Sequence, residues 1–184
     1  MACDITNGRL LSECKEGMAG VKTLFFFKYG GIVPVFEVDG SISDLGTAAG
    51  FRFEMGSSLG EVTETLNSTE ESGVAYIEQT ITLSLLSIKQ EDLADLNSLK
   101  RGQWHVFAMS YDNTTRAYGL LNGVSSSGGD STSGVAPADA KVLNMTFLGR
   151  ENDYAAFTEP PAAPSVPYNP FEDMVGVTIT PAYA

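Results

Sequence analysis

The amino-acid sequence predicts a mainly β fold, a β-sandwich or barrel of about seven to nine strands with one α-helix against its side. Three observations lead to this prediction: a long alternating segment over residues 73–86, a run of aromatic residues around Phe26, and a single segment with helix-boundary signals at both ends. The 184 residues are enough for one domain. We expect that domain over residues 21–158, an N-terminal arm over 1–20, and a proline-rich C-terminal extension over 159–184.

The segment from Gly73 to Leu86 has the clearest strand pattern. Apolar residues from Ala75 to Leu85 fall on one parity, broken only by Gln79, and polar residues fall on the other. A period of two held this long indicates a long strand with one buried and one polar face. The run Leu24–Phe27 has no helical period and is expected to be buried on both faces. Further strands are expected over residues 32–38, 50–56, 62–66, 104–111, 116–121, 141–149 and 174–180.

The helix is expected over residues 88–101. Ser87 and Gln90 match a capping box at its start, and Gly102 is a suitable residue to end it. Three leucines at helical spacing form the stripe that we expect to pack on the sheet: Leu93, Leu96 and Leu99.

The segment 123–136 is rich in serine and glycine and contains almost no large apolar residue. A segment of this composition has few side chains that could pack in a core. We therefore expect it to be a mobile loop within the domain.

Charge excludes several kinds of partner. The chain has 11 Lys and Arg against 23 Asp and Glu, a formal net charge of −12. A protein that grips nucleic acid or anionic lipid needs a basic surface, so neither role is expected. No apolar stretch approaches the roughly 20 residues of a membrane span. Cys3 and Cys14 lie close together in the arm and are expected to be free thiols.

Catalytic patterns are scarce. His105 is the only histidine, which removes most arrangements of a nucleophile and a base, and its place beside Trp104 favours a hydrogen-bonded strand histidine. Pairs of adjacent carboxylates, such as Glu91 and Asp92, point apart rather than across a cleft. Metal ligation would need more ligands of the right spacing. The sequence therefore predicts a protein that is not an enzyme and that has no cofactor or metal.

The order of elements between Gly73 and Asp153 resembles that of the tail tube proteins of bacteriophages. The residues that carry the resemblance are the long strand from Gly73, the helix between Gln90 and Leu99, the hairpin at Asp112–Asn113, and the late strand Val142–Gly149. Members of that family are β-sandwich or barrel subunits with a flanking helix that form stacked hexameric rings. The resemblance implies self-assembly, contacts with other phage tail proteins, and a place in the virion tail after assembly in the host cytoplasm.

A tube of this kind conducts DNA, which an acidic lumen would repel rather than bind. The net charge of −12 agrees with that role. Glu61, Glu64 and Glu78 fall in the polar strand segments and are the carboxylates that we expect to face the lumen.

Two alternatives stay open at this point. The chain could be another virion component, either a capsid decoration protein or a head–tail connector. It could instead be a β-sandwich that binds a carbohydrate or another small molecule, with Trp104, Tyr111 and Tyr118 as stacking surfaces.

Overall fold

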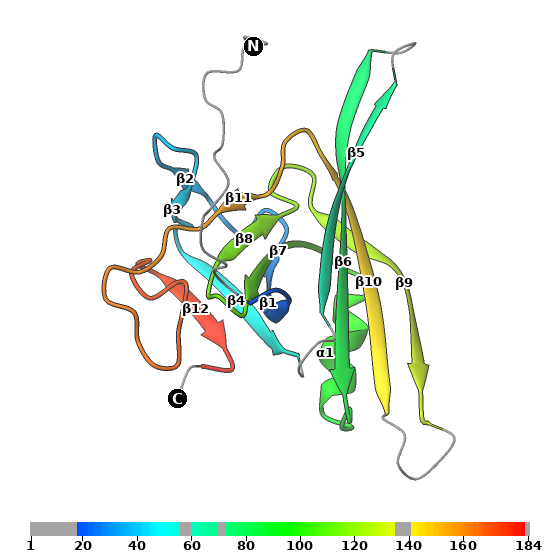
Figure 1. The fold of residues 1–184 in the computed structure, drawn as a ribbon. Coiled ribbons are helices and arrows are strands. Elements are labelled where there is room, and N and C mark those ends of the chain that lie inside the picture. Colours follow the sequence, from blue (N-terminus) through cyan, green and yellow to red (C-terminus); the bar gives the residue numbers. More distant parts are fainter. Residues whose placement is uncertain (1–17, 56–59, 70–72, 135–140, 183–184) are drawn as a thin grey trace.

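A computed structural model describes residues 18–55, 60–69, 73–134 and 141–182 of the chain. It confirms the mainly β fold with one helix (Figure 1). It contains twelve strands in the described residues, more than the sequence predicts, because three of them have only two or three residues. The elements are β1 (Val21–Lys28), β2 (Val35–Phe36), β3 (Ile42–Asp44), β4 (Ala48–Glu54), β5 (Glu61–Thr69), β6 (Val74–Leu86), α1 (Asp92–Leu99), β7 (Gln103–Ser110), β8 (Thr115–Tyr118), β9 (Val124–Thr132), β10 (Val142–Glu151), β11 (Ala156–Phe157) and β12 (Val177–Thr180).

Ten strands form one sheet, and eight of these follow the order β12-β4-β1-β7-β9-β10-β6-β5. β8 pairs with β7 and β11, while β2 and β3 pair only with each other. An isolated bridge joins Val21, at the start of β1, to Gly60, just before β5. The sheet therefore curls until β5 meets β1 at one point, which gives the barrel-like fold.

β1 is buried on both faces, as its aromatic run predicts. Leu24 and Phe26 belong to one core cluster, together with Ile81, Leu83 and other residues of β6, β7, β10 and α1. Phe25 and Phe27 belong to a second cluster on the opposite face, which includes Phe107. β1 and its neighbours thus separate two cores.

The long alternating segment is strand β6, which spans 13 residues. Its odd-numbered residues from Ile77 to Leu83 are buried, while even-numbered ones from Tyr76 to Thr82 are only half-buried. β6 pairs with β10 on one side and with β5 on the other, both antiparallel. The β5–β6 hairpin projects beyond the rest of the molecule at the upper end of Figure 1.

The prediction of a mobile loop over 123–136 is wrong for most of that segment. Residues 124–132 form strand β9, which pairs with β10 from Val124 opposite Gly149 to Thr132 opposite Val142. Residues 135 and 136 lie outside the described part of the chain. Composition misleads here because an edge strand is held by backbone hydrogen bonds to its neighbour and does not need large side chains of its own.

The helix is shorter than predicted. It begins at Asp92 rather than near residue 88, and no side chain of its N-cap residue makes a capping hydrogen bond. Ser87 has a φ of 52°, and the Asp92 carboxylate instead accepts a hydrogen bond of 2.8 Å from the Lys89 amide. Gly102 ends the helix as expected, since its amide donates to the Ser98 carbonyl at 3.1 Å.

Two of the three predicted helix leucines pack on the sheet. Leu96 and Leu99 are buried in the core cluster that contains Phe26. Leu93 is 41% exposed and lies outside that cluster, so its predicted role is wrong. Because the helix starts at Asp92, Leu93 sits in its first turn at the margin of the contact with the sheet.

The C-terminal segment is not a free extension. β12 adds to the sheet by parallel pairing with β4, with Ile179 opposite Gly50. Phe171 is 3% exposed, and its ring packs edge-on against the rings of Phe25, Phe27 and Phe107 at 5.1–5.5 Å between centroids. These anchors bury the segment on the second core cluster, so the domain continues through residue 180.

Most of the predicted N-terminal arm lies outside the described residues, as do Cys3 and Cys14; only residues 18–20 of the arm are described. Within the described residues, no helix is both long enough and apolar enough to span a membrane.

Candidate assembly interface

Strands β9, β10, β6 and β5 form an antiparallel four-stranded set whose two outer strands have free edges. β5 pairs with β6 alone along Glu61–Thr69. β9 pairs with β10 along its length, but with β7 only through Val124 and Ser125. Among the described residues, most of each outer edge therefore lacks a backbone partner. Such edges present unpaired N–H and C=O groups and can pair with another strand.

One face of this set is polar. Residues opposite each other on neighbouring strands share a face, so the register places the even-numbered side chains of β6 and β10 together with odd-numbered ones of β5. The members of this polar face are Glu61, Thr63, Thr65, Asn67, Thr69, Val74, Tyr76, Glu78, Thr80, Thr82, Ser84, Leu86, Ser125, Gly128, Asp130, Thr132, Val142, Asn144, Thr146, Leu148 and Arg150. Val74, Leu86, Val142 and Leu148 are its aliphatic members. The other face of β6 and β10 packs on the core through Ile81, Leu83 and Phe147.

Few side chains of the polar face are charged. Its acidic residues are Glu61, Glu78 and Asp130, and its only basic residue is Arg150. Arg150 Nε lies 3.2 Å from Glu78 Oε2, in an exposed ion pair. The Asp130 carboxylate accepts a hydrogen bond of 3.2 Å from the side-chain Nδ2 of Asn144. Hydroxyl and amide groups outnumber the charged ones on this face, and three carboxylates against one guanidinium give it a formal charge of −2.

The three predicted lumen carboxylates do not lie together. Glu61 and Glu78 are on the polar face, but Glu64 is on the opposite one. The Glu64 side chain is 10% exposed and forms an ion pair with Arg116 of β8 at 2.7 Å. It also accepts hydrogen bonds from the Ala155 amide at 2.8 Å and the Gln79 side chain at 3.2 Å. Glu64 joins β5 to the body of the domain, so the prediction that it faces a lumen is wrong.

The turn before β9 is fixed by buried polar side chains. Gln79, the one break in the alternation of β6, accepts a hydrogen bond of 2.9 Å from the Gly119 amide. Glu151 accepts hydrogen bonds from the amides of Leu121 and Asn122, the shortest at 2.8 Å. Burial raises the pKa of Glu151, and these amide bonds partly oppose that shift. These contacts hold the turn in the conformation from which β9 begins.

His105 contributes to the same turn. Its Nε2 accepts a hydrogen bond of 3.0 Å from the Gly30 amide, so its Nδ1 carries the proton and donates to the Gly119 carbonyl at 2.6 Å. Burial lowers the pKa of His105, so the neutral ring is favoured. The sequence prediction of a hydrogen-bonded strand histidine is confirmed.

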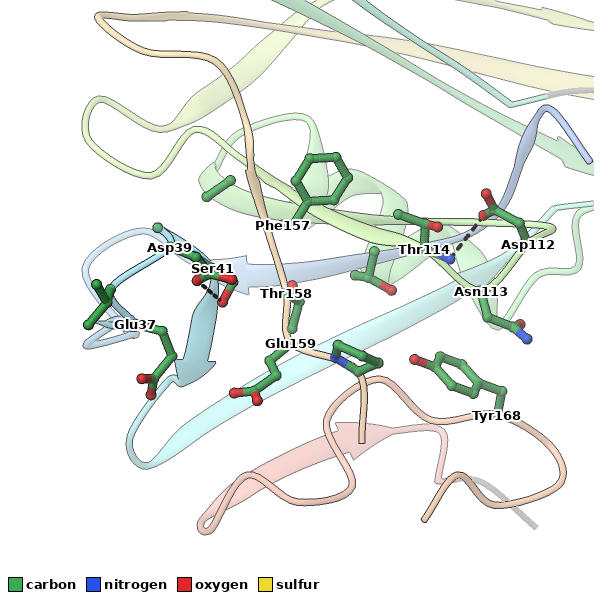
Figure 2. Close-up of a pocket in the computed structure, with 15 residues that line it drawn as sticks. Glu37, Asp39, Ser41, Asp112, Asn113, Thr114, Phe157, Thr158, Glu159 and Tyr168 are labelled. Carbon is green, nitrogen blue, oxygen red and sulfur yellow. Dashed lines mark hydrogen bonds between the residues drawn. The ribbon is translucent and has the colours of Figure 1, made fainter. Parts of the chain in front are cut away.

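A cavity of about 980 Å³ lies on another side of the molecule, beside β3 and the β7–β8 turn (Figure 2). Glu37, Asp39, Asp112 and Glu159 line it together with Tyr168. Two of these carboxylates shape local turns. Asp39 accepts from the Ser41 hydroxyl at 2.6 Å, which lowers its pKa, and Asp112 accepts from the Thr114 amide at 2.9 Å. The described residues contain no group of three acidic, histidine or cysteine side chains that could hold a metal ion.

A second cavity, of about 550 Å³, is surrounded by exposed apolar side chains. Phe36, Leu121 and Tyr154 line it, and each is 51–59% exposed. The turns that carry Leu121 and Tyr154 lie at the end of the molecule from which the β5–β6 hairpin projects (Figure 1). Apolar side chains gathered in this way are typical of contact surfaces. Nothing in the sequence pattern singles them out, because they come from three separate segments, the short strand β2 and two turns.

The aromatic residues considered for carbohydrate stacking do not form an open platform. The Trp104 indole packs against the core cluster and donates to the Leu99 carbonyl at 2.9 Å. Tyr118 is 4% exposed, and burial raises its pKa to about 12. Tyr111 is half-buried.

Comparisons of the chain with models of protein families, with curated proteins and with solved structures found no match.

Proposed function

We propose that this chain is a structural subunit of a bacteriophage tail tube, which self-assembles into stacked hexameric rings around a channel for DNA. The observation that carries this proposal is the pair of free edges on the four-stranded set. Neighbouring strands in the set alternate in direction, so in a set of four the two outer strands, β5 and β9, run in opposite directions. When copies are related by rotation, β5 of one copy therefore runs antiparallel to β9 of the next, and the sheet can continue from copy to copy.

A closed ring of such copies removes every free edge of the four-stranded sets, which is the arrangement that barrels use to avoid uncontrolled pairing. The polar face would line the channel because the bulk of each subunit lies on the other side. β1, β4, β7 and α1 all belong to that other side, where they cover the apolar face of β6 and β10. The exposed apolar side chains around Leu121 lie at one end of the subunit, where stacked rings would meet.

The polar face also suits passage of DNA. Binding to the phosphate backbone depends on Lys and Arg side chains that displace counterions. The only such residue on this face is Arg150, and Glu78 already pairs with it. DNA would be transit cargo that is not held. In this role the protein has no catalytic step; it resides in the virion tail, assembles in the host cytoplasm, and contacts other tail proteins.

No specific observation favours either alternative, a carbohydrate-binding protein or another virion component. The aromatic residues considered for a carbohydrate site are partly or fully packed in the domain, as Trp104 and Tyr118 show most clearly. A capsid decoration protein or head–tail connector needs no continuous sheet between copies.

Electron microscopy of the purified full chain tests the proposal, with a matched pair of variants in β9. A Cβ at Gly129 would collide with the Asn144 carbonyl oxygen on β10, whereas one at Gly128 would meet no atom within 4 Å. We expect rings or tubes from the unmodified chain and from Gly128→Ala, and loss of assembly from Gly129→Ala, which disturbs the edge. Particles that remain monomers at high concentration, or that bind only capsids, would refute the proposal.

A further inference from the structure

The two free edges lie at different heights along the strand direction. β5 lies level with residues 74–82 of β6, the half of that strand nearest the projecting hairpin. Through β10, the free part of β9 from Ser126 to Thr132 lies level with residues 81–86 of β6, the opposite half. Copies placed side by side at the same height would therefore join by only one or two residues.

Side-chain direction restricts the possible registers further. Paired residues on neighbouring strands must point to the same face of a continuous sheet. Thr65, at the middle of β5, belongs to the polar face, so its partner on β9 must belong to that face too, which excludes Gly129. Ser125 already pairs with β7, and pairing with Thr132, the last residue of β9, would leave half of β5 beyond the end of that strand. Gly128 and Asp130 remain as partners. A shift of one residue would turn the polar side chains of one strand toward the core side.

Each allowed partner corresponds to a definite shift along the strands. Thr65 lies level with Glu78 of β6. Gly128 lies level with Thr82, through Thr146, and Asp130 with Ser84, through Asn144. Pairing Thr65 with Gly128 thus displaces the next copy by about four residues, and pairing it with Asp130 by about six residues, or roughly 13 and 20 Å at about 3.3 Å per residue.

We infer that adjacent copies pair β5 with β9 in one of these two registers, so that the strands of the closed ring are tilted about its axis. Each copy contributes four strands at about 4.8 Å spacing, or roughly 19 Å across the strands. Shifts of roughly 13 and 20 Å over that width correspond to tilts of about 35° and 46°. Strands in closed barrels are tilted by about 35–45°. The difference in height between β5 and β9 within one subunit therefore produces the tilt that a closed ring needs, with all copies at the same height along the ring axis.

This inference rests on the proposed function, and disulfide cross-linking can test the two separately. In a background with Cys3→Ser and Cys14→Ser, assembled particles of Thr65→Cys paired with Gly128→Cys or with Asp130→Cys are oxidised mildly and run on a non-reducing gel. Antiparallel partners have the Cα separation that a disulfide requires. We expect a ladder of covalent oligomers, up to the ring size, from one of these two variants.

Two control pairs test other arrangements of adjacent copies. Glu61→Cys with Gly128→Cys joins residues at the same height, since both lie level with Thr82, and would cross-link only in an untilted ring. Thr65→Cys with Gly129→Cys joins residues of opposite faces. A ladder from either control, or none from any pair although microscopy shows rings, would overturn the register and leave the proposed function intact. A background chain that forms no rings would overturn both.

Discussion

Replacing Glu64 by Gln should destabilise the folded subunit, although this residue lies in a polar strand. The side chain is 10% exposed, and its carboxylate accepts three hydrogen bonds, from Arg116, Gln79 and the Ala155 amide. Gln keeps the shape and one acceptor oxygen but loses the negative charge opposite Arg116. The substitution therefore leaves a guanidinium without its counter-charge in a partly desolvated place.

The size of the effect follows from how well each partner is buried. Removing one partner of a fully buried ion pair costs about 3–5 kcal/mol, whereas exposed pairs contribute about 1 kcal/mol or less. Arg116 is 32% exposed on its side chain, so water can replace part of the lost interaction. We expect Glu64→Gln to lower the free energy of unfolding by about 2 kcal/mol, between these two limits.

Urea unfolding followed by circular dichroism measures this change, and Glu61→Gln is the matched control. Glu61 lies three residues away in the same strand, but it is exposed on the polar face. We expect its replacement to change stability by less than about 0.5 kcal/mol. Equal stabilities of the two variants, or a larger loss for Glu61→Gln, would show that the assignment of the two strand faces is wrong.

Two other substitutions test the body of the domain. Phe171→Ala should cost about 3–5 kcal/mol, because it removes a buried ring from the second core cluster; thermal denaturation that leaves the melting temperature unchanged would mean that the C-terminal segment is not part of the folding unit. His105→Gln should flatten the dependence of stability on pH. Burial lowers the folded-state pKa of His105 below the unfolded value of 6.5, so the unfolded chain binds more protons below that pH. Its contribution is complete above the unfolded pKa and is lost as pH falls below about 6.5 and through the lower folded-state pKa. Urea titrations at several pH values should show that loss in the natural chain and not in His105→Gln, and parallel pH profiles would contradict the argument.

The strands that the sequence predicts well are those whose own side chains are buried. In β1 and β6 the order of apolar and polar residues along the strand directly predicts which side chains are buried. β9 shows why other strands escape this reasoning. Seven of its nine residues are Ser, Gly or Asp, and it is ordered by the backbone of β10 and by the turn that Glu151 and Gln79 hold. That information lies in other segments of the chain.

The strand predicted over residues 174–180 is confirmed by β12, but the predicted end of the domain at residue 158 is wrong for a related reason. The prolines of the C-terminal segment correctly exclude a regular strand between residues 159 and 167, but they say nothing about what the following residues contact. Phe171 and Ile179 supply the burial, and partners such as Phe25 and Gly50 lie more than a hundred residues earlier in the sequence. Periodicity cannot detect isolated anchors of this kind.

For the candidate interface, the sequence shows that some carboxylates lie on different faces of a strand, but it does not show which face is the polar one. Glu61 and Glu64 differ by an odd number of residues, so a regular strand must put them on opposite faces. Which of the two faces the core depends on the register with β6 and on Arg116, which belongs to a strand far along the chain. Alternation within β5 is weak because Glu64 and Ser68 share the even-numbered positions with Val62 and Leu66.

The distribution of charge changes the physical account of the proposed channel. The carboxylates on the polar face number no more than three, and Arg150 pairs with one of them. The other acidic side chains of the described residues lie elsewhere, for example on the first turn of α1 and around the cavity that contains Asp112 and Glu159. In the proposed tube, DNA would pass because the lining offers almost no free cation to replace its counterions, and a dense negative lining would be unnecessary. The acidic excess on the other surfaces would instead oppose unspecific association of free subunits, so that only copies with correctly matched strand edges join.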